Sequence, residues 1–218
     1  MRDAVLFLQG RFSARHLSFY KRLCRGKFKI AVDGGYRFFA RAGIAPDLLL
    51  GDFDSLKKVP KNLPSKTEVL TYPADKDQTD THLALEYCLE RNSRQIDIVQ
   101  PSIGEPDHFT ANLMLLTLAE RYRRRGYAPK VRLLNAECEI RYVRDGMVRF
   151  ERAAGDTVSV IPLSRTVELT CAGTVFDVRR RRVSRGQTLA SRNRIDHPKA
   201  VFRLKGEGLI FRLFAKSP

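Results

Sequence analysis

The segment from Pro73 to Leu89 places three carboxylates directly in front of a helix, and the rest of the chain is interpreted around it. Asp75, Asp77 and Asp80 stand in its first part, and apolar residues then recur at helical spacing. An apolar run that ends at Tyr72 comes immediately before it. One interpretation is purely structural, because Asp77 is a suitable N-cap and the helix dipole favours an acid three residues later.

A second acidic segment argues against that interpretation alone. Gly51-Asp-Phe-Asp-Ser55 also follows an apolar run, and Asp33 and Asp107 follow other predicted strands. The carboxyl ends of parallel strands meet at one edge of a sheet, so we expect these acids to gather at one rim. Carboxylates that are close together need a counter-charge, which Mg²⁺ supplies while it takes its remaining ligands from water and phosphate oxygens. Gly34, Gly35 and Gly51 allow the backbone to approach a phosphate, although the sequence has no Walker A and no GxGxxG motif.

The two halves of the chain have different patterns. Up to Pro129, short apolar runs alternate with helices, which predicts a mostly parallel, Rossmann-like sheet flanked by helices over residues 1–130. Residues 131–218 show only short strands and turns, which predicts an antiparallel β-sandwich. The boundary between the two domains is therefore expected at residues 127–137.

Several local elements are expected within these halves. Helices are expected over residues 14–23, 36–42 and 109–124. Asp145-Gly146 predicts a two-residue hairpin, and Gly206-Glu-Gly208 predicts another tight turn. Four consecutive arginines, Arg179 to Arg182, are typical of a loop or an exposed strand edge.

Charge and cysteine content limit the classes of function. The net charge is +16, and residues 130–218 hold 19 Lys and Arg against 9 Asp and Glu. Such an excess fits nucleic acid, anionic lipid or phosphorylated small molecules, or simply a surface of solvated arginines. The four cysteines lie far apart in the sequence and do not have the spacing of metal ligands. This indicates reduced cysteines that serve packing, and hence a protein of the cytoplasm. No segment resembles a signal peptide or a membrane anchor.

The acidic segments, in this order and spacing, resemble the signatures of thiamine pyrophosphokinases. The segments that carry the resemblance are Asp33-Gly-Gly35, Gly51-Asp-Phe-Asp-Ser55, Lys76-Asp-Gln-Thr-Asp80, and Asp107-His108 before a helix with Asn112. In the second half, residues 158–163 and 167–173 resemble the β-domain of that family. The resemblance thus covers most of the chain.

The resemblance implies an activity and a set of site residues. The family transfers a pyrophosphoryl group from ATP to the hydroxyl group of thiamine and releases AMP, with Mg²⁺ as cofactor. The implied catalytic and metal-binding residues are Asp52, Asp54, Asp77 and Asp80, with Asp77 alternatively taking the proton of the alcohol. The implied nucleotide-binding residues are Asp33, Gly34, Gly35, Ser55, Lys76, Thr79, Gly104, Asp107, His108 and Asn112. The implied thiamine-binding residues are Ser191 and Asn193. The family also implies a homodimer, in which thiamine lies between the α/β domain of one copy and the β-domain of the other.

Two departures from the family pattern concern the loop before Asp107 and the thiamine anchors. Ile103 replaces a glycine and Glu105 stands where the family has an arginine, while Arg192 is inserted between Ser191 and Asn193. These changes leave open a different acceptor, such as a hydroxymethyl pterin. Two further alternatives are a metal-dependent phosphohydrolase and a catalytically decayed module that binds phosphate or nucleic acid. The acidic rim argues against nucleic acid, because carboxylates without metal repel a phosphate backbone.

Overall fold

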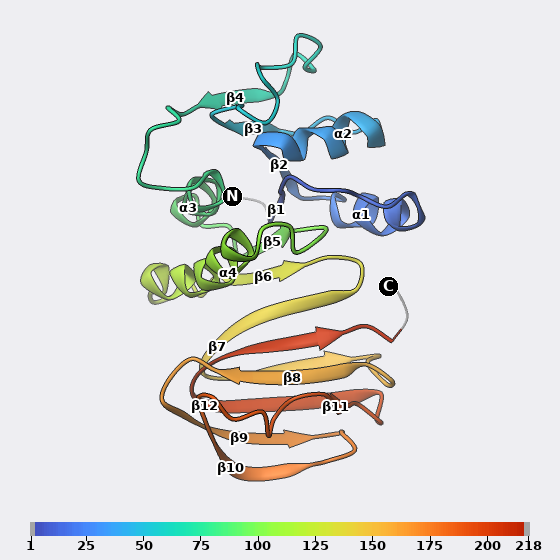
Figure 1. Ribbon diagram of the computed structural model, residues 1–218, viewed down its shortest axis with the longest axis vertical. Coiled ribbons are helices and arrows are strands. Elements are labelled where there is room, and N and C mark those ends of the chain that lie inside the picture. The colour runs from blue at the N-terminus through green and yellow to red at the C-terminus, as the bar shows by residue number, and fades with distance from the viewer. Residues whose placement is uncertain (1–2, 216–218) are drawn as a thin grey trace. The chain divides into compact units, whose positions relative to one another are not determined.

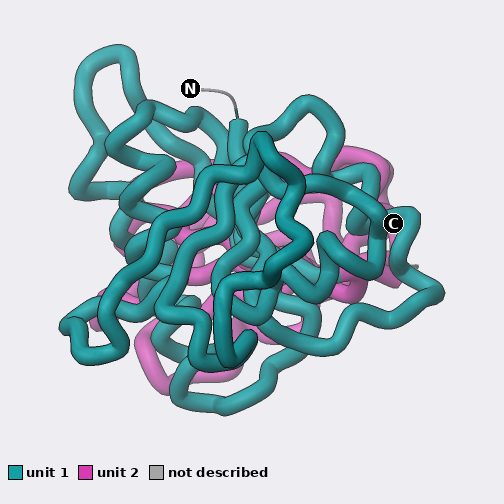
Figure 2. The backbone as a smooth tube through the Cα atoms, turned by 90° about the horizontal axis from the view of Figure 1, so that it is seen from above, with its two compact units in different colours: residues 1–135 teal, residues 136–218 magenta. Residues whose placement is uncertain are grey.

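The computed structural model describes residues 3–215. The chain divides into two compact units, residues 1–135 and residues 136–218, shown in teal and magenta in Figure 2. The first unit combines helices with parallel strands, and the second is built from antiparallel strands. This confirms the predicted class of fold. The boundary expected from the sequence, between residues 130 and 131, lies close to the division between the units.

The strands of the first unit form a parallel sheet in the order β6-β5-β1-β2-β3-β4. Their bounds are Ala4–Phe7 (β1), Phe28–Val32 (β2), Leu48–Gly51 (β3), Glu68–Thr71 (β4), Gln95–Val99 (β5) and Lys130–Leu134 (β6). Every residue of β1 and β3 is buried, because the strands of such a sheet are covered on both faces. The acidic segments follow β2, β3 and β4, so they begin at the same edge of this sheet.

Helices cover this sheet on both faces. Their bounds are Ala14–His16 (η1, a 3-10 turn), Leu17–Leu23 (α1), Asp33–Gly35 (η2), Tyr36–Ala42 (α2), Asp80–Glu90 (α3), Pro106–Leu115 (α4) and Leu116–Tyr122 (η3). The chain passes from β1 to β4 in one direction and then returns to β5 and β6. Since parallel crossovers are right-handed, α1 and α2 lie on one face and α3 and α4 on the other (Figure 1). None of the described helices has the length and apolarity needed to cross a membrane.

Aromatic packing fixes α1 and α2 against the sheet. The rings of Phe7 on β1 and Phe38 on α2 stack with centroids 4.1 Å apart, and both side chains are fully buried. Phe12 and Tyr20 complete the cluster with edge-on contacts. Large buried aromatic side chains dominate core energetics, so this cluster holds the beginning of α2, and with it Asp33, in a fixed position.

Two helices differ from the sequence prediction. The helix expected over residues 109–124 begins earlier, at Pro106, because proline suits the first turn, and after Leu115 it tightens into the 3-10 helix η3. Helix α3 begins at Asp80, and its N-cap is Thr79, whose side chain accepts a hydrogen bond from His82 N at 3.3 Å. The interpretation of Asp77 as the N-cap is therefore wrong, and Asp77 lies in the loop before the helix.

The second unit is an antiparallel sandwich around an apolar core. Its strands are Cys138–Glu151 (β7), Thr157–Pro162 (β8), Thr166–Ala172 (β9), Val178–Ser184 (β10), Asn193–Arg194 (β11) and Lys199–Leu213 (β12). The first part of β12 pairs with β9, and the second part pairs with β8. A register shift in β12 between Leu204 and Glu207 lets one strand serve both sheets. The core includes Phe150 and Phe202, whose ring centroids are 5.9 Å apart.

Both turns predicted in this unit are wrong. Asp145-Gly146 lies inside β7, and Gly206-Glu-Gly208 lies inside β12. The two strands pair along their whole length, and Asp145 Oδ1 accepts a hydrogen bond from Gly206 N at 2.7 Å. Asp145 and Gly206 have positive φ values of 43° and 99°. Residues that tolerate positive φ suit a bulge as well as a hairpin, and here they form an irregularity within a long ribbon.

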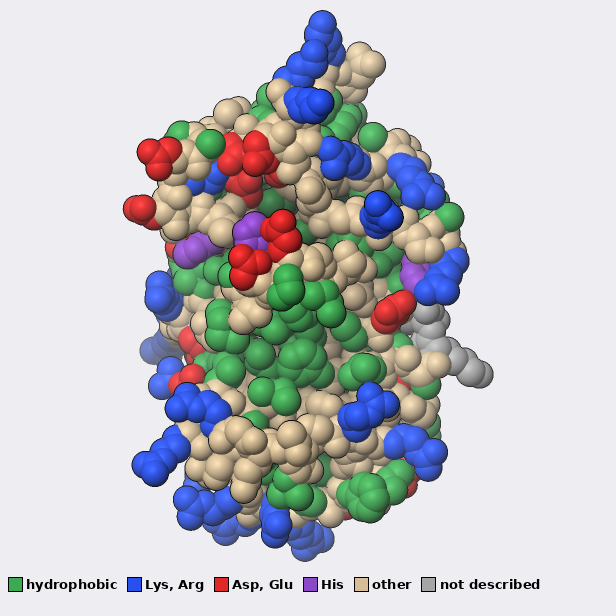
Figure 3. All heavy atoms as spheres, viewed as in Figure 1, with side chains coloured by type: hydrophobic (Ala, Val, Ile, Leu, Met, Phe, Trp, Pro, Cys, Tyr) green, Lys and Arg blue, Asp and Glu red, His purple; other side chains and the backbone are tan. Residues whose placement is uncertain are grey.

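The arginine run forms an edge strand, as predicted. β10 pairs with β9, and all four side chains from Arg179 to Arg182 are exposed. Arg180 has a φ of 48°, and the register shifts between Val178 and Arg181, so the strand departs from strict alternation. Lys and Arg side chains crowd the surface over β9 and β10 (Figure 3). Exposed charge on an edge strand discourages pairing with other strands.

Candidate active site

The acids at the carboxyl ends of β2 and β3 form a cluster in the first unit. Asp33 follows β2, Asp52 and Asp54 follow β3, and one carboxylate oxygen from each lies within 4.8 Å of the others. Acidic side chains gather beside the ends of β3 and β4 in Figure 3. The sequence predicted that separate loops deliver acids to one rim, and the structure brings these three together.

Gly51 makes this close approach possible. A Cβ atom at this position would lie 3.0 Å from the Cβ atom of Asp33 and 3.1 Å from Oδ2 of Asp80. The φ angle of Gly51 is +152°, which side chains rarely adopt. Gly51 therefore serves the packing of Asp33 and Asp80 around the end of β3.

Asp33 has a buried carboxylate oxygen that suits a cation. Its side chain is 8% exposed, and its Oδ1 atom is buried without a hydrogen-bond partner among the described residues. Its φ angle is +42°, a conformation uncommon for residues other than glycine. A buried carboxylate oxygen without a partner is unfavourable, unless a cation or a donor completes it.

The chemistry of the three acids fits a hard divalent cation. Their donors are carboxylate oxygens, the ligands that Mg²⁺ prefers, and the unpartnered Oδ1 of Asp33 points to the same conclusion. Phe53 anchors the loop between the other two acids: its side chain is 3% exposed, although its φ angle of 64° is unfavourable for a bulky residue. The burial of Phe53 thus fixes Asp52 and Asp54 on either side of it.

Lys76 supplies a positive charge inside this cluster. Its Nζ atom donates to Asp52 Oδ2 at 2.8 Å and to the carbonyl oxygen of Pro73 at 3.0 Å, and it lies 3.3 Å from Asp80 Oδ1. The hydrogen bond from Lys76 is the largest cause that holds the pKa of Asp52 below its usual value. Burial opposes the charged form of Lys76, but the carboxylates of Asp52 and Asp80 outweigh it and raise the lysine pKa.

The pKa of Asp80 is shifted in the opposite direction to that of Asp52. Burial is the largest cause of its raised pKa, and the charges of Asp52 and Asp33 add to it, although Lys76 acts in the other direction. Asp80 lies in the first turn of α3, next to the N-cap Thr79. Asp77, which was predicted as a ligand, is exposed in the preceding loop and does not belong to the cluster of described acids within 4.8 Å.

Hydrogen bonds from two buried side chains hold the loop between β5 and α4 in place. Asn112, which is buried, donates from Nδ2 to Gln100 Oε1 at 3.2 Å, and Gln100 donates from Nε2 to the carbonyl oxygen of Ile103 at 3.3 Å. Asn112 therefore supports the loop that carries Gly104. Gln100 was not among the residues predicted from the sequence, and its position as a polar residue directly after a buried strand is the signal for it. Asp107 is exposed.

Glu105, the N-cap of α4, and His108, in the first turn of that helix, pair on the surface. His108 Nδ1 lies 3.1 Å from Glu105 Oε2, and their side chains are 68% and 75% exposed. The departure at Glu105 thus gives the neighbouring histidine an acidic partner.

Gly34, Gly35 and Ser55, which are predicted to bind nucleotide, also have close contacts within the first unit. A Cβ atom at Gly35 would lie 1.8 Å from the carbonyl oxygen of Phe7, and one at Gly34 would lie 2.0 Å from Gln9 Oε1. These glycines bring the backbone close to the end of β1. The carbonyl oxygen of Ser55 accepts a hydrogen bond from Arg37 Nη2 at 2.5 Å, which ties the acidic loop to α2.

In the second unit, Asn193 holds a surface turn. Its Oδ1 accepts from Phe176 N at 3.2 Å, and its Nδ2 donates to the carbonyl oxygen of Phe176 at 2.9 Å and to Thr174 Oγ1 at 3.0 Å. The Phe176 side chain is 71% exposed, the largest exposure among the large hydrophobic residues of the described chain. Ser191 is partly exposed, and Arg192 is exposed with a φ of 58°.

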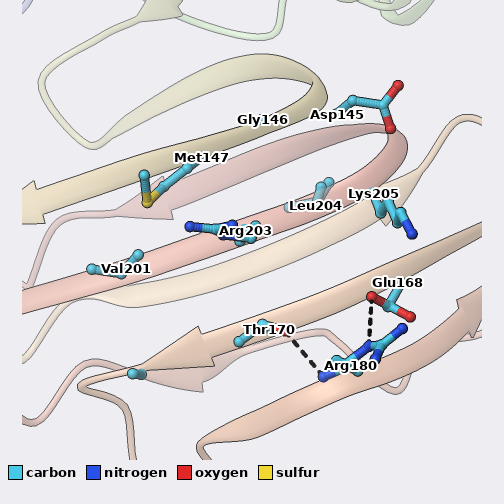
Figure 4. A pocket seen from close by; sticks show the side chains of 11 residues that line it. Asp145, Gly146, Met147, Glu168, Thr170, Arg180, Val201, Arg203, Leu204 and Lys205 are labelled. Carbon is cyan, nitrogen blue, oxygen red and sulfur yellow. Dashed lines mark hydrogen bonds and ion pairs between the residues drawn. The ribbon is translucent and has the colours of Figure 1, made fainter.

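A pocket of about 1000 Å³ lies elsewhere on the second unit, on strands β7, β9, β10 and β12 (Figure 4). None of the site residues predicted from the sequence lines it. Its charged side chains have both signs, and Arg180 donates to Glu168 Oε1 at 3.2 Å and from its backbone N to Thr170 Oγ1 at 3.0 Å. This mixed lining favours neither an anion nor a cation.

Comparison with known proteins places these features in a family context. The family model described as "Thiamin pyrophosphokinase, catalytic domain" matches residues 20–125, which include the acidic cluster and Lys76. A thiamine pyrophosphokinase of Bacillus subtilis (strain 168) is 32% identical over 180 residues, covering 79% of this chain and 80% of that protein.

Solved structures agree with the sequence comparison. A crystal structure of thiamine pyrophosphokinase from Bacillus subtilis superimposes with a TM-score of 0.80 at 26% identity, covering 98% of this chain and 99% of that chain. A thiamin pyrophosphokinase from Candida albicans, at 15% identity, shares the fold with a TM-score of 0.74, covering 98% of this chain and 89% of that chain.

Proposed function

Because this chain belongs to the thiamine pyrophosphokinase family, we propose that it transfers a pyrophosphoryl group from ATP to the hydroxyl group of thiamine and releases AMP. The observation that carries the proposal is the acidic cluster around the unpartnered Asp33 Oδ1, which lies within the matched catalytic domain. A cluster of this kind suits phosphoryl chemistry, in which the negative charge of the phosphates has to be neutralised.

We assign the metal to Asp33, Asp52 and Asp54, with Mg²⁺ as the ion that fits their oxygens. When bound, Mg²⁺ neutralises the charge of the phosphates and leaves coordination positions for their oxygens. Other residues of the chain hold the metal-binding carboxylates in position. Phe53 fixes the loop that carries Asp52 and Asp54, and Arg37 ties that loop to α2. Asp77 and Asp80 stay predicted catalytic residues, and Asp77 is the exposed one of the two.

We place the thiamine anchors in the second unit, at Ser191, Asn193 and the neighbouring Phe176. Thiamine carries a permanent cationic ring, so its site is expected to offer an aromatic wall and a few polar groups. Phe176 is an exposed aromatic ring, and Asn193 fixes the backbone on both sides of it. The side chain of Asn193 is engaged by this turn, so its proposed role is to present Phe176 to the acceptor.

We also propose a cytoplasmic homodimer. Cys24, Cys88 and Cys171 are buried free thiols. Burial raises the pKa of Cys88 to about 12 and that of Cys24 to about 11, so these two residues serve packing. A homodimer would have twice the 24.9 kDa mass of the chain, which light scattering after size-exclusion chromatography measures directly.

The test is AMP release from Mg-ATP by the purified protein with a panel of acceptors: thiamine, a hydroxymethyl pterin and water. We expect AMP release that depends on thiamine and stops in excess chelator. AMP release with the pterin alone would identify a different acceptor, and release in the absence of any alcohol would identify a phosphohydrolase. Failure to release AMP with every acceptor would reject the proposed activity.

A further inference from the structure

Lys76 is built into the acidic cluster as an internal counter-cation. Its side chain is 14% exposed, and its ammonium group contacts oxygens of Asp52, Asp80 and Pro73. Lysine is a compact point charge on a flexible stem, so it can bridge two carboxylates and neutralise one of their two charges without fixing their geometry. In the free chain, one positive charge thus stands where several carboxylates converge.

This lysine divides the acids into two groups. Lys76 donates a hydrogen bond to Asp52 and forms an ion pair with Asp80, whose Oδ1 atom lies 3.3 Å from Nζ but accepts no hydrogen bond from the described residues. The Oδ1 atom of Asp33 has neither kind of contact among these residues. Asp52 belongs to both groups, because its Oδ2 binds Lys76 and it is also one of the three acids of the cation cluster. A divalent ion on that cluster would share the charge of Asp52 with the ammonium group of Lys76. The ion and the ammonium group would repel each other, because both would contact the same carboxylate.

The loop that carries Lys76 is suited to release it. Pro73, Ala74, Asp75 and Asp77 are exposed around the lysine, and its contact with the carbonyl oxygen of Pro73 stays within the loop. The far end of the loop is fixed by the N-cap Thr79. The ammonium group can therefore leave the carboxylates without disturbing α3.

We propose that Lys76 competes with the divalent cation for Asp52 until nucleotide phosphates draw the ammonium group away. Metal and nucleotide then bind cooperatively, since the phosphates remove the competing charge and the metal gains the freed carboxylate of Asp52. This inference rests on the proposed function, because it requires a metal and a phosphate ligand at the site. It makes Lys76 a positioning residue that couples the two ligands.

The experiment measures Mn²⁺ affinity from the electron paramagnetic resonance signal of free Mn²⁺, with and without α,β-methylene ATP, whose methylene bridge blocks pyrophosphoryl transfer. The variants are Lys76→Gln, Lys76→Arg and, as matched control, Lys61→Gln, which removes an equal charge from an exposed lysine in the loop between β3 and β4. Circular dichroism and thermal melting establish that each variant is folded.

Without nucleotide, we expect Lys76→Gln to bind Mn²⁺ about tenfold more tightly than the wild type, the size expected when one charge-assisted hydrogen bond no longer competes. Lys76→Arg and Lys61→Gln should stay within about twofold of the wild type. The analogue should tighten Mn²⁺ binding in the wild type and much less in Lys76→Gln.

Two results separate failure of this inference from failure of the proposed function. Equal or weaker Mn²⁺ binding by folded Lys76→Gln, with thiamine-dependent AMP release intact in the wild type, would overturn the role of Lys76 and leave the function standing. Absence of both Mn²⁺ binding and AMP release in the wild type would overturn both.

Discussion

Arg132 binds both carboxylate oxygens of Asp97: Nε donates to Oδ1 at 2.6 Å, and Nη2 donates to Oδ2 at 3.2 Å. The Asp97 side chain is completely buried in β5, and Lys27 also donates to its Oδ2. Burial acts to raise the pKa of Asp97, but Arg132 and Lys27 outweigh it and hold that pKa below its usual value. Strand β5, next to the last strand of the parallel sheet, therefore carries one buried carboxylate that pairs with two cations.

We expect Asp97→Asn to lower the free energy of unfolding by about 3–5 kcal/mol, because it leaves two cationic groups without their partner. Urea unfolding measures the loss, and Asp196→Asn, at an exposed aspartate, is the control. Since the folded-state pKa of Asp97 is lowered, its contribution is present above the unfolded pKa, about 3.9, and is lost as the pH falls through the folded pKa. A difference between wild type and variant that persisted unchanged at pH 2 would contradict this explanation.

Asp33→Asn should separate stability from function. The substitution removes a buried charge whose Oδ1 atom has no partner, so the free energy of unfolding should stay the same or rise by up to about 1 kcal/mol. Thiamine-dependent AMP release should fall by more than about 100-fold, because a cation ligand is lost. Glu90→Gln, at the exposed end of α3, should change neither quantity. A large loss of stability with normal AMP release would assign Asp33 a structural role.

The sequence was sufficient for the acidic rim but not for what neutralises it. Asp33, Asp52 and Asp54 each follow an apolar strand, and parallel strands bring their ends together, so their meeting follows from local pattern. The contact of Lys76 with Asp52 and Asp80 depends on how the loop after β4 folds back, which no local pattern encodes.

The failed hairpins have a similar cause. Asp-Gly tolerates positive φ in a turn and in a bulge alike, and the choice is made by the pairing of β7 with β12 along the whole of both strands. That pairing joins Asp145 to Gly206, residues far apart in the sequence. The pattern of neighbouring residues does not predict partners that are this far apart in the sequence.

Gly51→Ala adds only one methyl group, but it should disturb both the stability of the first unit and the geometry of the acidic cluster. The added Cβ atom would lie 3.0 Å from the Cβ atom of Asp33 and 3.1 Å from Asp80 Oδ2, so both acids must move. We expect a loss of about 1–3 kcal/mol in the free energy of unfolding and a weaker metal site. Gly186→Ala is the matched control, since Gly186 has a φ of +90° but no atom within 4 Å of the added Cβ. Equal losses of stability and AMP release in both variants would assign the effect to φ alone.

The exposed arginines of β10 should contribute little to folding. Replacing Arg179, Arg181 and Arg182 by Gln should change the free energy of unfolding by less than about 0.5 kcal/mol per site, because all three side chains are exposed. Fluorescence anisotropy with labelled single-stranded and duplex DNA or RNA tests the rival nucleic-acid function. We expect no tight binding at physiological salt. Tight, salt-sensitive binding that the substitutions abolish would favour that rival function.

The acceptor site gives the final prediction, because Asn193 and Phe176 act as one unit. Asn193→Ala removes the three hydrogen bonds that hold the turn, and Phe176→Ala removes the exposed ring itself. If the ring forms a wall for thiamine, both variants should raise the KM for thiamine by about tenfold while the KM for ATP stays unchanged, and the double variant should be no worse than Phe176→Ala. Leu189→Ala, at another exposed apolar residue of the second unit, is the control. Additive effects of the two substitutions would show that Asn193 contacts the acceptor independently of Phe176, and an unchanged KM for thiamine in all variants would place the acceptor elsewhere.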